Sequence, residues 1–162
     1  MDIAVSYHDT VTKLQGLDLP ASSPFDRLEW YALLEHPLFA MAERLGDRVV
    51  VPLQRHPNGL SSLTNWFSFT WQPIGKSQEL IRELARDLRS RTHRVTLSPL
   101  PDEDGTAEQL EKTFRDAGWL VLRDQCDENH VLPVAGRTFA EYWAGRPGKM
   151  RTTLKRKAKK VD

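Results

Sequence analysis

The chain has 162 residues, of which 40% are hydrophobic and 9% aromatic, and its 23 Lys and Arg nearly balance its 22 Asp and Glu. This composition excludes a disordered chain, and no apolar run approaches the ~18 residues of a membrane helix. The only cysteine, Cys126, excludes an internal disulfide and a cysteine-based zinc site. Because the N-terminus also lacks the pattern of a signal peptide, we expect a single-domain cytoplasmic protein.

The N-terminal half predicts a strand, a helix and three further strands. Ile3, Val5 and Tyr7 alternate as in a strand, and Ser23-Pro24 opens a helix. That helix is expected to half-bury Trp30 and to bury four other side chains: Phe25, Leu28, Leu33 and Leu34. Residues 38–45 and 48–54 predict two strands joined by a turn at Gly46-Asp47, and a turn at 57–59 leads to a third strand region over 60–71. We therefore expect an antiparallel meander over residues 38–71.

The C-terminal half alternates helices and strands. Ser77 is expected to cap a helix that runs to about Arg91, and capping boxes at Thr106/Gln109 and Thr138/Glu141 predict two more helices. Strands are expected over 94–100, 119–123 and 131–134. The side chains expected to be buried are Leu80, Ile81, Leu84, Ala85, Leu88, Val95, Leu97, Leu110, Phe114 and Ala117. The order β-α-β-β-β-α-β-α-β-β-α-α predicts the α/β or α+β class with a mixed sheet.

The charge is distributed unevenly along the chain. The last 17 residues, 146–162, contain eight Lys and Arg and one acid, whereas the preceding 145 residues contain 15 basic and 21 acidic side chains. Pro147 suits the first position of a helix, and an apolar face follows it at helical spacing: Met150, Leu154, Ala158 and Val161. Cations flank this face on both sides. The sequence therefore predicts an acidic body that carries a cationic, amphipathic helix.

Residues 142–157 resemble a motif of the GNAT-type acyltransferases of the CelD/BioF-like and Fem-like kind. In that motif a short aromatic helix leads into Arg-Pro-x-Lys-x-Arg and a helix rich in Lys and Arg; here the matching run is Arg146-Pro147-Gly148-Lys149-Met150-Arg151. Residues 63–70 resemble the family's strand approaching the substrate cleft, and residues 25–30 its opening helix. The resemblance covers nearly the whole chain, with 142–157 as its specific part. It implies a GNAT-like, largely antiparallel mixed sheet flanked by helices.

The resemblance also implies a division of labour between two lobes. Residues 1–145 would form the N-terminal lobe, and 146–162 would be a basic helix connecting it to a second GNAT lobe absent from this chain. Acyl-CoA, such as acetyl-CoA, would be the co-substrate and would be held mostly by that second lobe. No glycine-rich loop for the CoA pyrophosphate occurs here, and residues 55–59, with one glycine, are rejected as that loop. We expect an N-acyltransferase lobe that binds no cofactor and is inactive alone.

The same resemblance gives candidate substrate-binding residues. The family's matching helix borders the acceptor cleft, so Arg146, Lys149, Arg151 and Lys155 are candidates to bind a phosphate or carboxylate of the acceptor. Tyr142 and Trp66 complete the candidate set. The acceptor would be an amine-bearing small molecule or a glycan or peptide precursor. No catalytic base and no metal site is assigned.

Simpler interpretations stay open at each of these features. The cationic helix could be a solvated charged face, and the aromatic run at Trp66, Phe67, Phe69 and Trp71 could be core packing, with the last three on one face of a strand. Cys126 and His130 stand four apart in an acidic turn, which we interpret as an ordinary solvated loop. His8, His36, His56 and His93 are treated as isolated.

Other functions also remain. A Fem-like lobe would take aminoacyl-tRNA in place of acyl-CoA, although the coiled-coil insertion of that group is absent. A nucleic-acid-binding module would use the basic helix, but the acidic body would repel a polyanion and no aromatic residues interleave the basic run. A structural, non-catalytic GNAT-like half that supports partner binding is the third alternative.

Overall fold

The computed structural model describes residues 2–21, 23–126 and 135–158. The chain divides into two compact units, Met1–Cys126 and Asp127–Asp162. We describe each unit by itself. The lobe boundary expected between residues 145 and 146 stays a prediction.

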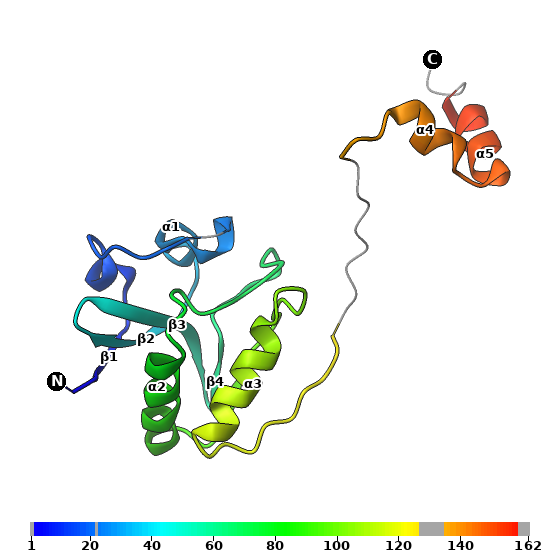
Figure 1. Ribbon diagram of the computed structural model, residues 1–162. Coiled ribbons are helices and arrows are strands. Elements are labelled where there is room, and N and C mark those ends of the chain that lie inside the picture. Colours follow the sequence, from blue (N-terminus) through cyan, green and yellow to red (C-terminus); the bar gives the residue numbers. More distant parts are fainter. Residues whose placement is uncertain (1, 22, 127–134, 159–162) are drawn as a thin grey trace. The chain divides into compact units, whose positions relative to one another are not determined.

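A five-stranded mixed sheet in the order β1-β2-β3-β4-β5 forms the centre of the first unit (Figure 1). Its strands are β1 (Ala4–His8), β2 (Pro37–Arg44), β3 (Asp47–His56), β4 (Gly59–Ser62) and β5 (Val95–Thr96). The first four pair antiparallel, and β5 pairs parallel to β4 through Leu60↔Val95 and Ser61↔Thr96. In β2 and β3 the runs 38–42 and 49–53 are buried throughout, as expected for central strands covered on both faces. The structure thus confirms a mixed α+β fold.

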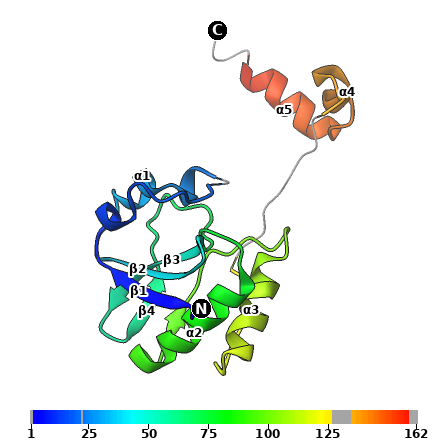
Figure 2. The same ribbon diagram turned by 60° about the vertical axis from the view of Figure 1, so that its left-hand side comes forward.

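Helices cover the sheet. The first unit contains the 3-10 turns η1 (Val11–Leu14) and η2 (Pro24–Asp26) and the helices α1 (Leu28–Tyr31), α2 (Gln78–Arg91) and α3 (Thr106–Asp116). All five apolar residues predicted on one face of α2 are buried. The Trp119 indole N–H, just after α3, donates a 2.8 Å hydrogen bond to the carbonyl of Ala85 in α2. Both views show α2 and α3 side by side, with α1 across the strands from α2 (Figures 1 and 2).

The helix predicted from Ser23-Pro24 is wrong in its extent. Ser23 and Asp26 form a reciprocal capping box that closes a 3-10 turn, and Arg27 then adopts an extended backbone before the four-residue α1 begins. The side chain that reaches the core is Tyr31, packed edge-on against Phe39, whereas Leu33 is 75% exposed. The interruption at Arg27 changes which face of the segment points inward.

The third strand region predicted over 60–71 ends at Ser62. Asn65 and Ser68 then close a turn: the Asn65 carboxamide oxygen accepts from the Phe67 N–H at 2.9 Å, and the Ser68 N–H donates to the Asn65 carbonyl at 3.0 Å. The chain rejoins the sheet at Ile74, which exchanges two 2.8 Å hydrogen bonds with Val50. Of the four aromatic residues predicted here as core, only Trp71 is buried. The turn chemistry outweighs the alternating pattern.

Three smaller predictions are also wrong. The strand predicted over 94–100 is limited to Val95–Thr96. The predicted capping box of Thr106 and Gln109 does not form, because Thr106 is the first residue of α3 and Gly105 is its N-cap. The Asp104 carboxylate accepts a hydrogen bond from the Thr106 N–H at 3.0 Å. Residues 119–123 form no strand, although Trp119 and Val121 pack against the core. The strand predicted over 131–134 lies outside the described residues.

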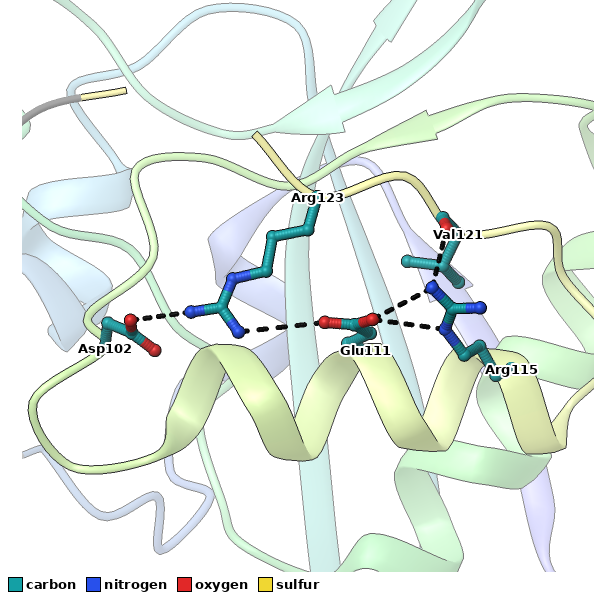
Figure 3. Close-up of polar contacts among 5 residues, drawn as sticks. All are labelled: Asp102, Glu111, Arg115, Val121 and Arg123. Carbon is teal, nitrogen blue, oxygen red and sulfur yellow. Dashed lines mark hydrogen bonds and ion pairs between the residues drawn. The ribbon is translucent and has the colours of Figure 1, made fainter. Parts of the chain in front are cut away.

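Side chains, in place of strand pairing, hold the segment after α3 (Figure 3). Arg115 donates to Glu111 at 2.9 Å and to the Val121 carbonyl at 3.0 Å. Arg123 pairs with Asp102 at 2.6 Å and lies 3.7 Å from the second oxygen of Glu111. Glu111 therefore connects two arginines that together fix residues 121–123 against α3. Leu120 and Leu122 are left 87% exposed.

The second unit contains two helices among its described residues, α4 (Phe139–Ala144) and α5 (Gly148–Ala158). The predicted capping box of Thr138 and Glu141 is confirmed. Pro147 stands one position before α5 and accepts the first helical hydrogen bond, from the Arg151 N–H at 3.1 Å. Neither helix buries a residue. Across the described ranges, no helix combines the length and apolarity needed to cross a bilayer.

Candidate functional site

Two of the candidate substrate-binding residues are in direct contact at the junction of α4 and α5. The Arg146 guanidinium lies 4.4 Å from the centre of the Tyr142 ring, a cation–π arrangement. Its Nε is shielded from solvent and makes no hydrogen bond with the described residues. A shielded N–H without an acceptor is costly. The terminal N–H groups of the same guanidinium also have no acceptor among the described residues, and they could bind an anionic ligand. The Thr138/Glu141 cap fixes the start of α4 and thereby the position of Tyr142.

Lys149 borders a hollow on the exposed apolar face of α5. The hollow has a volume of about 440 Å³ and is lined by Pro147, Lys149, Met150, Thr153 and Leu154. Met150 and Leu154 remain 41% and 43% exposed, so the described part of the predicted apolar face is only partly covered. Val161, the last member of that face, lies outside the described residues. An apolar hollow with a cation at its edge suits a ligand or partner segment that has both an apolar part and a negatively charged group.

The remaining cations of α5 are available to solvent. Arg151 is half-buried and Lys155 is exposed. Among the described residues, no ion pair joins any Lys or Arg of 146–157 to a carboxylate. In the first unit, by contrast, many arginines have acidic partners. The positive charge of α5 is therefore uncompensated within the described chain.

Trp66 belongs to the first unit, and the other five candidate residues belong to the second. The Trp66 side chain is 93% exposed at the tip of the Asn65–Ser68 turn. Phe69, in the same loop, stacks edge-on with Phe25 at 5.9 Å between ring centres, and Phe25 stacks on Trp30 at 5.3 Å. An aromatic surface thus flanks the turn. The role of Trp66 as a cleft wall stays a prediction.

Sequence reasoning missed a pocket at one end of the sheet. It has a volume of about 430 Å³, and its lining residues are Tyr7, Leu38, Arg55, His56, Pro57, Gly59, Leu60, Leu88, Arg91, Thr92 and His93. His56 and His93, treated as isolated in the sequence, line the same pocket. The end of β3 and the C-terminus of α2 meet here, and no local pattern in the sequence encodes that meeting. Residues 55–59 comprise the end of β3, the turn at Pro57-Asn58 and the first residue of β4.

A hydrogen-bonded group of three side chains connects β1 to α2 at this pocket. The Tyr7 hydroxyl donates to Asp87 at 2.6 Å, Arg91 pairs with Asp87 at 2.6 Å, and the Arg91 guanidinium lies 4.1 Å over the Tyr7 ring. Burial raises the pKa of Tyr7, and the Asp87 carboxylate raises it further. Burial also raises the pKa of Asp87, but hydrogen bonds from Tyr7 and Arg91 outweigh it and hold that pKa below its usual value. Tyr7 is thus a neutral donor and Asp87 an anion.

Neither a metal site nor thiol chemistry emerges from the part of the chain that the structure describes. Within it, no three His, Cys, Asp or Glu are grouped closely enough to hold a metal ion. Cys126 is exposed, and His130 lies outside the described residues. His56 lies 2.7 Å from the Ser61 hydroxyl, but that pair is exposed and no carboxylate hydrogen bond orients the ring.

No family model, curated protein or solved structure matches this chain. Functional assignment therefore depends on side-chain chemistry. Two features carry such chemistry: the Tyr142–Arg146 contact with the cationic α5, and the pocket at the end of the sheet.

Proposed function

We propose that this chain is the N-terminal lobe of a GNAT-type N-acyltransferase of the CelD/BioF-like kind, which transfers an acyl group from acyl-CoA to an amine acceptor. Two features support the proposal. The motif at residues 142–157 resembles that family, and the mixed sheet, four antiparallel strands followed by one parallel strand reached through α2, is of the kind that the resemblance implies.

The observation that carries the proposal is the Arg146 guanidinium, which lies over the Tyr142 ring and whose shielded Nε has no hydrogen-bond acceptor among the described residues. It stands at the start of a helix whose cations have no acidic partner among the described residues. Such an arrangement can hold a phosphate or carboxylate of the acceptor through an arginine fork and nearby lysine charges. Arg146, Lys149, Arg151 and Lys155 are proposed to bind and orient the acceptor, with Tyr142 restraining Arg146.

Acyl transfer requires three things of the complete site. The acceptor amine must lose a proton to a base, its nitrogen must attack the thioester carbonyl, and CoA must leave as the thiol after collapse of the tetrahedral intermediate. Backbone N–H groups usually stabilise the oxyanion. We assign this chain the orientation of the acceptor, and we place the acyl donor and its oxyanion donors on a second lobe.

Exposed apolar side chains support the proposal that a second lobe covers part of this chain. Leu120 and Leu122 project from the segment after α3, and Phe139 of α4 is 75% exposed. In the second unit, Met150 and Leu154 lie together on one exposed face of α5, and exposed apolar patches commonly mark surfaces covered by another domain or chain. We propose that the second lobe covers at least the apolar face of α5.

An acyl-transfer assay tests the proposal. The protein encoded by the complete reading frame that contains this chain is incubated with acetyl-CoA and a panel of anionic amines, and acylated products are detected by mass spectrometry. We expect product from that protein and none from residues 1–162 alone. Arg146→Gln should raise KM for the acceptor at least tenfold, whereas Lys13→Gln, on the first unit, should leave it unchanged. Absence of any acylated amine with the complete protein would refute the proposal.

A further inference from the structure

The pocket between the end of β3 and the C-terminus of α2 has an uneven distribution of charge. Its rim contains Arg55, His56, Arg91 and His93, and none of the described residues that line it carries a carboxylate. This is unusual in a chain with 22 acidic residues, most of them outside the cationic end. The floor is apolar, since Leu38 and Leu88 belong to the buried core and Leu60 packs against it.

Two of these four side chains, Arg55 and His93, are unpaired among the described residues. Neither the Arg55 guanidinium nor the His93 ring makes a hydrogen bond or ion pair with the described residues, whereas Arg91 is committed to Asp87 and His56 contacts Ser61. Arg55 comes from β3 and His93 from the turn after α2, so the fold brings them together from distant parts of the sequence.

The pocket geometry suits a small ligand. A volume of about 430 Å³ lies in the range of small-molecule sites, which combine an apolar lining with a few polar groups that fix orientation. The C-terminal end of α2 contributes about half a negative charge, which disfavours an anion. The two guanidinium groups at the rim outweigh it, although Asp87 offsets part of the charge of Arg91.

We propose that this pocket binds a small organic anion, with its carboxylate or phosphate held by Arg55 and His93 and its apolar body lying on Leu38, Leu60 and Leu88. Arg91, also on the rim, contributes positive charge while remaining paired with Asp87. The site belongs entirely to the first unit. It is independent of the acceptor site proposed on α4 and α5.

Binding can be measured on the whole chain with simple probes. Phenyl phosphate and benzoate carry the two candidate head groups, inorganic phosphate lacks the apolar body, and benzyl alcohol lacks the charge. In amide NMR titrations we expect phenyl phosphate or benzoate to shift Gly59, Thr92 and His93 with a millimolar or tighter Kd. Inorganic phosphate should bind at least fivefold more weakly, and benzyl alcohol should leave these amides unshifted. Whichever aromatic anion binds more tightly identifies the head group.

Variants separate recognition from folding. Arg55→Gln combined with His93→Gln should weaken binding at least tenfold, and Arg55→Lys, which keeps the charge but loses the planar fork, should weaken it less. Arg27→Gln, an exposed arginine on another element, is the matched control and should bind as the parent does. All three variants change exposed positions only, so their amide spectra should otherwise match that of the parent. The proposal is overturned if neither aromatic anion shifts the pocket amides, if benzyl alcohol binds equally well, or if the double variant binds unchanged.

Discussion

The Tyr7 hydroxyl donates a 2.6 Å hydrogen bond to the Asp87 carboxylate, and this contact joins the edge strand β1 to α2 across 80 positions of sequence. Arg91 completes the group from the same helix. Because Tyr7 also lines the pocket at the end of the sheet, the contact fixes one wall of the proposed anion site.

Asp87→Asn should destabilise the fold by about 1–2 kcal/mol at pH 7, because the hydrogen bonds from Tyr7 and Arg91 lose their charged acceptor. The folded-state pKa of Asp87 is lowered, so its stabilising contribution is fully present above the unfolded pKa of about 4 and is lost as pH falls through the folded value. Urea unfolding at several pH values should therefore show the largest gap between parent and variant near neutrality and a shrinking gap below about pH 4. Tyr7→Phe, which deletes one donor and keeps the ring under Arg91, should cost less. A gap that widens in acid would contradict this assignment.

Gly75→Ala and Gly46→Ala form a matched pair that separates steric clash from backbone strain. Both glycines have positive φ, +95° and +89°, but a Cβ on Gly75 would lie 2.3 Å from the Arg48 carbonyl oxygen, whereas one on Gly46 would meet nothing within 4 Å. Gly46→Ala should cost about 1 kcal/mol. Gly75→Ala should cost roughly 1–3 kcal/mol more, because the bridge between Ile74 and Val50 must shift. Equal losses in thermal unfolding would show that the close approach at Gly75 is relieved without cost.

Glu111→Gln should release the segment after α3. The substitution removes the charge that connects Arg115 and Arg123, and these arginines hold residues 121–123 (Figure 3). Hydrogen exchange of the Trp119 amide, which donates to the Phe114 carbonyl at 3.0 Å where the segment begins, should accelerate severalfold while the amides of α2 keep their protection. Asp116→Asn breaks the exposed pair with Lys112 on the same helix and is the control. Unchanged exchange in Glu111→Gln would mean that packing of Trp119 and Val121 alone holds the segment.

The cationic α5 also permits a test of the nucleic-acid alternative. If the chain binds nucleic acid through this helix, affinity for random duplex should fall steeply with salt, with a log–log slope of about −3 or steeper. We expect no binding at ~50 mM salt, because the first unit is acidic and the basic run lacks stacking aromatics. Fluorescence anisotropy over a salt series decides between the two, and measurable, salt-sensitive binding would favour the module.

Apolar periodicity predicted much of the fold. Helical spacing of apolar residues predicted the buried face of α2, and two apolar runs joined by a turn at Gly46-Asp47 predicted the β2–β3 hairpin. The prediction for residues 63–71 is wrong because Phe67, Phe69 and Trp71 alternate as strand residues do, while the decisive signal, Asn65 with Ser68, is a turn motif inside that pattern. The α1 region was mispredicted for a related reason, since the Ser23/Asp26 cap closes only one turn.

The candidate sites differ in how far the sequence could predict them. The Tyr142–Arg146 contact joins residues four apart and is within reach of sequence reasoning. The pocket at the end of the sheet is not, because Arg55 and His93 become neighbours only through the parallel crossover that packs α2 against the sheet and places β5 beside β4. Local periodicity contains no information about such a meeting of distant elements.

Calorimetric titration of acetyl-CoA, performed on residues 1–162 and on the protein encoded by the complete reading frame, tests most directly whether this chain is the acceptor-side lobe of an acyltransferase. The account predicts binding by the complete protein, with a Kd of about 1 μM to 1 mM as is usual for enzyme substrates, and no detectable heat with residues 1–162. Equally tight binding by residues 1–162 alone, or none by the complete protein, would contradict it.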